Sequence, residues 1–130
     1  MTLRTQHNLN VGMHGEAFAS AKYKRFAAFA RARQNNQLAA LLTEVAEESR
    51  IGHFAEAMQL AGLLADDLGN LQDVIRDKRY HTKRYRQFAQ EAEQDGDTHA
   101  AALFKGLATD DEAHLRELET ALAQYQEHQP

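Results

Sequence analysis

The sequence predicts an all-α protein with an antiparallel four-helix bundle, and three observations support that fold class. Strong helix formers, chiefly alanine, leucine, glutamate, glutamine and arginine, dominate the 130 residues. Apolar residues recur at a spacing of about 3.6 along four long segments, as they do in amphipathic helices. The only proline is the last residue, Pro130, so no helix in the body of the chain lacks a backbone donor.

The first half of the chain is expected to form a helical hairpin. Its first helix runs from about residue 8 to 33, and its second from about 37 to 64. The polar run 34–36 separates them, and a connection this short favours antiparallel neighbours. Helical spacing predicts these inward residues: Phe18, Ala21, Phe26, Phe29 and Ala30 on the first helix, and Leu38, Leu41, Leu42, Val45 and Ala46 on the second.

The second half is expected to form a similar hairpin. A short connection, 66–70, contains Gly69 and leads into a third helix over about 71–94. The run 95–98 then offers a helix-stopping glycine, followed by an aspartate and a threonine that can cap the next helix. The fourth helix is expected over about 99–125.

The two halves align with each other without a gap when the sequence is shifted by 62 positions (23 and 85, for example). Tyr23 then falls on Tyr85, and Phe26-Ala27 falls on Phe88-Ala89. Shared helical periodicity could produce part of this match, but the paired aromatic positions favour a duplicated hairpin. We therefore predict a single domain over 1–130, built from two hairpin repeats at about 8–64 and 70–126.

Several short motifs resemble those of rubrerythrins. Gly15-Glu16 with Tyr23 and Phe26 resembles their first helix, and 70–89 resembles their third. Asp111-Glu112-Ala113-His114 resembles the acid-x-x-His step of their fourth helix. The resemblance covers nearly the whole chain. It implies a ferritin-like bundle that holds two irons and reduces peroxide, with a carboxylate on the first and third helices and an acid-x-x-His pair on the second and fourth.

Transferred residue by residue, the implied metal centre is incomplete. Glu16 matches the carboxylate of the first helix. Ser49 and Gly52 occupy the positions of the second-helix acid and histidine. Lys78 occupies the third-helix carboxylate position, and His81 stands one turn later, where rubrerythrins place a glutamate.

The fourth helix keeps its implied pair. Asp111 and His114 stand three residues apart and so share a helix face, with aspartate in place of the usual glutamate. Tyr23 and Tyr85 are expected in the core with their hydroxyls bonded to this site. Each histidine could instead be an ordinary core residue, and Asp111 a surface acid; the repeat is what favours treating them together.

Two changes of register would alter this ligand set. Sliding the third helix by one residue would turn Asp77 inward, followed by Tyr80, although that breaks the repeat. A local bulge in the second helix could turn Glu48 or His53 inward, and Gly52 is where such an irregularity could sit.

Charge determines what the predicted cluster can hold. Glu16 and Asp111 contribute two negative charges and Lys78 one positive charge, so two divalent ions would leave an excess of about +3 in a poorly solvated interior. We therefore expect either no metal, with the ammonium held between Glu16 and Asp111, or one divalent ion (iron, manganese or zinc) on Glu16, His81, Asp111 and His114. Two irons held through shifted ligands are a third, less favoured arrangement.

Composition restricts partners and location. A net charge of −4 argues against nucleic acid or an anionic membrane as a general partner, and the basic run on the third helix is expected to be a solvated face. No signal peptide or membrane span is predicted, which favours the cytoplasm. The resemblance to rubrerythrins implies an attached rubredoxin module with four cysteines as electron donor. This sequence has no cysteine, so we expect any reductant to be a separate protein. The resemblance also implies a homodimer.

Overall fold

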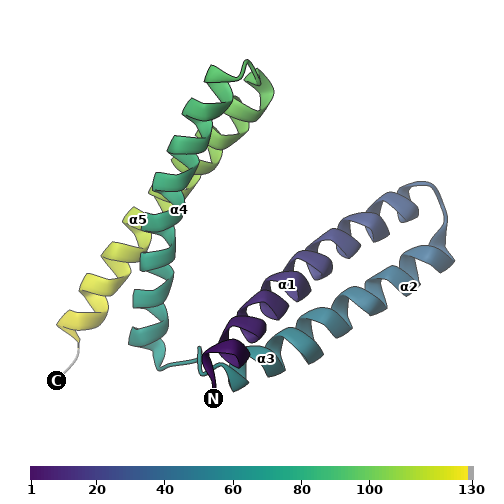
Figure 1. Ribbon diagram of the computed structural model, residues 1–130, viewed down its shortest axis with the longest axis horizontal. Coiled ribbons are helices and arrows are strands. Elements are labelled where there is room, and N and C mark those ends of the chain that lie inside the picture. The colour runs from purple at the N-terminus through teal and green to yellow at the C-terminus, as the bar shows by residue number, and fades with distance from the viewer. Residues whose placement is uncertain (129–130) are drawn as a thin grey trace. The chain divides into compact units, whose positions relative to one another are not determined.

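The computed structural model describes residues 1–128, and within that range the protein consists of helices and turns with no β-strand. The prediction of an all-α protein is therefore confirmed. The chain divides into two compact units, Met1–Leu64 and Ala65–Pro130, and each contains a helical hairpin (Figure 1).

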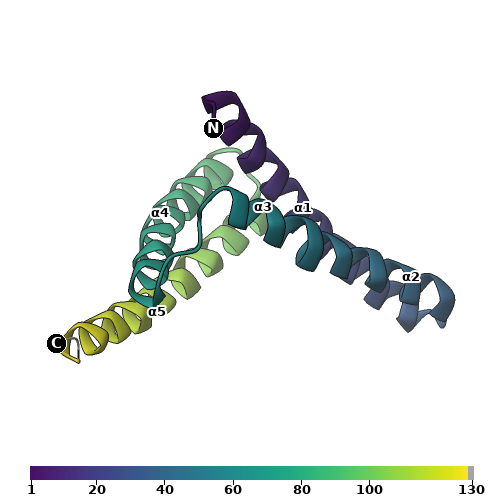
Figure 2. The ribbon, with the colours of Figure 1, turned by 90° about the horizontal axis from the view of Figure 1, so that it is seen from below.

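In the first unit, α1 (Leu3–Ala32) pairs with a second helical rod. That rod consists of α2 (Asn36–Glu47), a π-helical turn η1 (Glu48–Phe54) and α3 (Ala55–Leu60), which follow one another without a break. Both ribbon views show the rod lying beside α1 (Figures 1 and 2).

The ends of these helices have local causes. The Thr2 hydroxyl accepts a hydrogen bond from the Thr5 amide at 3.2 Å, so α1 begins several residues earlier than predicted. Gln34 reverses the chain with a φ of 63°. Gly62, with a φ of 71°, follows the last turn of α3, and the rod therefore ends before residue 64.

In the second unit, α4 (Asp67–Gln94) pairs with α5 (Thr98–Glu127). The Asp66 carboxylate accepts a hydrogen bond from the Gly69 amide at 2.8 Å, which caps α4 and starts it before the predicted residue 71. Gly96 has a φ of 77° and ends the helix as predicted.

The interior of each hairpin is lined mainly by small side chains, and the two interiors correspond through the repeat. Six buried residues of the first hairpin each lie 62 positions before a buried residue of the second (13 and 75, for example). The shared burial pattern supports a duplicated hairpin, because a chance match of periodicity need not reproduce the same contacts. The pairs are Met13 and Ile75, Ser20 and Thr82, Ala27 and Ala89, Ala30 and Ala92, Ala39 and Ala101, and Ala46 and Ala108.

Within the first hairpin, several of the large apolar residues predicted to point inward lie outside the contact between its two helical rods. Phe18 is 67% exposed, Phe29 63% and Leu41 56%, whereas Ala30 and Ala46 are buried as predicted. Two helices that meet through alanines approach closely, so their contact has no room for aromatic rings. Periodicity identified apolar positions correctly but not which helix face carries the contact.

No helix within residues 1–128 combines the length and the apolar character that crossing a membrane requires.

Candidate functional site

In the first hairpin, the π-helix brings a histidine to the predicted carboxylate. His53 Nδ1 lies 3.6 Å from Glu16 Oε2, which makes an ion pair when the imidazole is protonated. Gly52 lies beside His53 inside η1 and directs no side chain at Glu16. Of the registers considered for this helix, the structure therefore has the one with a local bulge.

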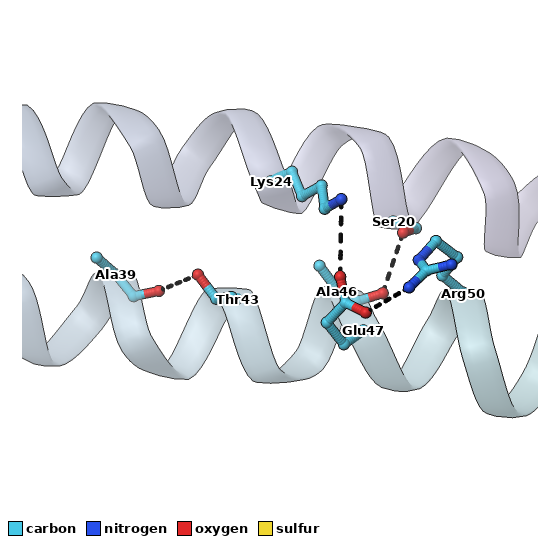
Figure 3. A network of polar contacts seen from close by, with 7 residues as sticks. All are labelled: Ser20, Lys24, Ala39, Thr43, Ala46, Glu47 and Arg50. Carbon is cyan, nitrogen blue, oxygen red and sulfur yellow. Dashed lines mark hydrogen bonds and ion pairs between the residues drawn. The ribbon is translucent and has the colours of Figure 1, made fainter.

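Ser20 gives a physical reason for the bulge. Its buried hydroxyl donates a 3.0 Å hydrogen bond to the Ala46 carbonyl, just before η1 begins (Figure 3). A side chain that donates a hydrogen bond to a helix carbonyl competes with the backbone amide that would otherwise bind it, and this favours a local widening of the helix into a π-turn. In the second hairpin the matching Thr82 hydroxyl donates instead to the backbone carbonyl of Lys78 in its own helix, at 2.7 Å, and α5 stays a regular α-helix.

Replacing Ser20 with alanine should therefore destabilise the first hairpin. We expect the free energy of unfolding to fall by about 1 kcal/mol, because a buried hydrogen bond between the two helices is lost. Thr43→Ala is the matched control, since the Thr43 hydroxyl bonds only to the Ala39 carbonyl of its own helix (Figure 3). Urea unfolding followed by circular dichroism measures both variants. Equal effects would show that the Ser20 bond contributes nothing specific.

An ion-pair network lies beside the same turn. Glu47 receives a 2.7 Å hydrogen bond from Arg50 and lies 3.6 Å from the Lys24 ammonium of α1 (Figure 3). The Arg50 hydrogen bond, together with the charges of Arg50 and Lys24, holds the pKa of the Glu47 carboxyl below its usual range. The network joins α1 to the start of η1, although its side chains are well exposed.

The π-helix also changes the register of the repeat. Beyond η1, residues of the first hairpin correspond to the second at an offset of 61 (53 and 114), one fewer than before it. His53 is thus the counterpart of His114. The half-buried residues of the two rods then match again: Phe54 with Leu115, Ala57 with Leu118, and Ala61 with Leu122.

In the second hairpin, the lysine at the predicted carboxylate position bonds to the predicted acid. Lys78 Nζ lies 2.9 Å from Asp111 Oδ1. The Asp111 side chain is only 13% exposed and that of Lys78 30%. An ammonium therefore occupies a carboxylate oxygen that a metal ion would need.

The remaining predicted residues are placed as follows. His81 and His114 are both exposed, and the His81 ring stacks on Tyr85 with centroids 6.2 Å apart. Tyr85 in turn stacks on Phe104 at 6.3 Å, and Tyr23 lies 6.4 Å from Phe26. Within residues 1–128 the hydroxyls of Tyr23 and Tyr85 make no hydrogen bond. Ser49 is buried and lies one turn before His53.

The structure brings together two of the predicted site residues in one hairpin, Lys78 and Asp111, and joins Glu16 to a histidine considered only as an alternative. The sequence does carry a signal for His53. A glycine in mid-helix precedes it, and the spacing of the half-buried residues beyond it changes by one.

Neither hairpin by itself holds the donor set of a two-iron centre. Such a centre needs several carboxylates and two imidazoles around adjacent ions. Within the part of the chain that the structure describes, no three acidic or histidine side chains converge as metal ligands. In the second hairpin Lys78 pairs with Asp111, and in the first hairpin Ser49 stands at the position of the second-helix acid.

A scan against protein-family models and a search of curated proteins both gave no match for this sequence.

Proposed function

We propose that this protein is a rubrerythrin-like member of the ferritin-like group in which the two-metal site has degenerated. In this proposal the two hairpins form a single antiparallel four-helix bundle over 1–130, and the protein works as a binding or assembly module, as a homodimer in the cytoplasm, rather than as a peroxidase.

The observation that carries the proposal is the ion pair between Lys78 and Asp111. Its 2.9 Å distance and its limited exposure mean that the ammonium neutralises Asp111, the acid that remains at a predicted ligand position of the second hairpin. A divalent ion at Asp111 would have to displace this cation or lie beside it, and both arrangements are unfavourable in a poorly solvated site.

Loss of the site is distributed over both repeats, which supports degeneration rather than a single substitution. The first hairpin retains Glu16 and His53 but has Ser49 at its second acid position. The second retains Asp111 and His114 but has Lys78 where the first has Glu16. The carboxylate that is missing from the first repeat is therefore not the one that is missing from the second.

Elemental analysis of protein purified without a chelator tests this function. We expect less than one equivalent of iron, manganese or zinc per chain and no turnover of peroxide with an added electron donor. Refolding in excess iron, manganese or zinc and then desalting should give the same result, which excludes loss of metal during purification. About two irons per chain would show the proposal to be wrong.

The contact between Glu16 and His53 favours a second candidate, a metal-dependent oxidoreductase in oxidative-stress defence. A carboxylate and an imidazole 3.6 Å apart are suitable ligands for one divalent ion, and Asp111 and His114 could complete the set if Lys78 moved away. This candidate requires an external electron-transfer protein. One equivalent of tightly held metal, lost in both Glu16→Gln and His53→Gln, would favour it.

A further inference from the structure

The interiors of the two hairpins do not distinguish one repeat from the other. Four buried alanines of the first hairpin each correspond to a buried alanine of the second, and the buried Ser20 corresponds to the buried Thr82. Burial alone would therefore also allow α1 to pack on α5, or α4 to pack on the rod of the first hairpin. Wrong pairing of equivalent segments is a characteristic failure of chains with internal repeats.

Charged contacts inside the hairpins do distinguish the repeats. In the first hairpin the acid belongs to the first helix, because Glu16 of α1 lies 3.6 Å from the His53 imidazole of the rod. In the second hairpin the base belongs to the first helix, because Lys78 of α4 lies 2.9 Å from Asp111 of α5. Glu16 and Lys78 are equivalent in the repeat, so α1 and α4 carry opposite charges at this position.

A second reversal of charge lies closer to the turn of each hairpin. Glu93 of α4 makes an ion pair with Lys105 of α5. The residue of α1 that is equivalent to Glu93 is Arg31, which has the opposite charge. The rod has the neutral Thr43 at the position equivalent to Lys105. The sign of the charge on the first helix therefore differs between the repeats at two positions.

Exchange of partners between the repeats would bring like charges together. With α1 on α5, Glu16 would face Asp111 in place of its histidine. Arg31 would face Lys105 in the same arrangement. With α4 on the rod, Lys78 would lose its acid, because the rod has a serine at the position of Asp111. Like charges placed opposite each other penalise a wrong partner and so help to select the right one.

Other charged positions are the same in both repeats and therefore do not separate them. Lys24 of α1 is equivalent to Arg86 of α4, and both are basic. His114 is the counterpart of His53, so an exchanged α1 would still meet an imidazole beside Glu16. The distinction between the repeats thus depends on the reversed positions. We call the six residues at these positions the pairing charges: Glu16, Arg31, Lys78, Glu93, Lys105 and Asp111.

We propose that the pairing charges direct each helix to the partner in its own repeat and prevent exchange of helices between repeats, within one chain or between two copies. The turns 33–35 and 95–97 bring neighbouring helices together, and the charges disfavour the exchanged arrangement while the chain folds. Lys78 then has a role in folding that needs no metal. The inference stands on contacts within each hairpin, so its failure is separable from the failure of the proposed function.

Disulfide trapping shows which helices pair, because the natural sequence contains no cysteine. The hydrogen bond from Ser20 to the Ala46 carbonyl places these two residues opposite each other (Figure 3). Two turns further along α1 and two turns back along the antiparallel rod, the buried Ala27 and Ala39 lie opposite each other in the same way.

Two cysteine pairs follow from this register. In the second hairpin the equivalent residues are Ala89 and Ala101, which are also buried. Ala89→Cys with Ala101→Cys therefore reports the native pairing of α4 with α5. Ala27→Cys with Ala101→Cys reports the exchanged pairing of α1 with α5.

Each full-length double-cysteine protein is unfolded in urea, refolded by dilution into a glutathione redox buffer, and digested for mass spectrometry without reduction. The native pair should be linked in most chains, and the exchanged pair in less than about one tenth of chains. Glu16→Lys with Arg31→Glu gives α1 the charges of α4, and it should raise the exchanged disulfide about fivefold or more. Refolding at several protein concentrations separates exchange within a chain from exchange between copies.

The matched control is Ser20→Ala, which removes a contact of the first hairpin without changing any charge. In this variant the exchanged disulfide should stay at the level found with the natural charges. A rise as large as that of the charge reversal would mean that a weakened hairpin, and not its charge, permits exchange, and the proposal would be overturned.

A second reversal makes the test independent of the fate of the first variant. Lys78→Glu with Glu93→Arg gives α4 the charges of α1, and it should raise the disulfide formed by Ala89→Cys with Ala39→Cys. Circular dichroism checks that each variant folds, and the two reversals alter different hairpins. An exchanged disulfide as frequent as the native one under the natural charges would overturn the proposal, as would folded reversal variants that leave the exchanged disulfide unchanged.

Discussion

Deletion of Gly52 is expected to leave the first hairpin folded, with the free energy of unfolding changed by no more than about 1 kcal/mol. The π-helix contains one residue more than the matching stretch of α5, and the residues beyond it already follow the register of the second hairpin. Removing that residue converts the turn to an ordinary α-helix. It keeps His53 beside Glu16 and keeps Phe54 and Ala57 on the face that they now occupy.

The matched control is deletion of Ala113, which precedes His114 in α5 as Gly52 precedes His53. Helix α5 has no π-helix to absorb the change, so every residue after the deletion rotates by about 100° relative to α4. Leu115, Leu118 and Leu122 would leave their half-buried positions. We expect a loss of about 3 kcal/mol or more from their exposure alone.

Urea unfolding followed by circular dichroism compares the two deletions. If they cost the same, the π-helix would not be an inserted residue relative to the repeat, and the assignment of His53 as the counterpart of His114 would be wrong.

Replacing Lys78 with alanine should lower the free energy of unfolding by about 2 kcal/mol at neutral pH. The substitution leaves the Asp111 carboxylate, which is 13% exposed, without the cation 2.9 Å from it. Lys83→Ala, on the same helix but exposed, should change stability by no more than about 0.5 kcal/mol. A double-mutant cycle with Asp111→Ala isolates the pair, and a coupling near zero would contradict its structural role.

The Lys78→Glu variant extends the same experiment to metal binding. It gives the second hairpin the carboxylate that the first has at Glu16, and it places this carboxylate against Asp111. In the presence of a chelator this variant should be less stable than Lys78→Ala, because two acids repel each other. A rise in its unfolding midpoint with added zinc or manganese would show that one substitution restores a metal ligand set. The same rise in Lys78→Ala would mean that removing the ammonium is enough and that the new carboxylate adds no ligand, whereas the same rise in the natural sequence would mean that the ammonium does not block the site.

Much of the candidate site could be predicted from sequence because the repeat supplies an internal reference. Aligning Tyr23 with Tyr85 was enough to show that Lys78 occupies the position equivalent to Glu16 in the repeat. The pairing of Lys78 with Asp111 was then predicted from that alignment. The position of His53 could not be settled in the same way. A π-helix depends on competition for one carbonyl, and the competing hydroxyl of Ser20 lies on the other helix.

The amino-acid sequence by itself determined that the protein is helical, where the chain turns, and that its two halves are versions of one hairpin. These properties follow from helix propensity, glycine at positive φ and local spacing, which act over a few residues. Only the tertiary structure decided which face of each helix packs against its partner within the hairpin. Alanines rather than phenylalanines fill the contact, because two helices can approach closely only where side chains are small, and that requirement involves residues distant in the chain.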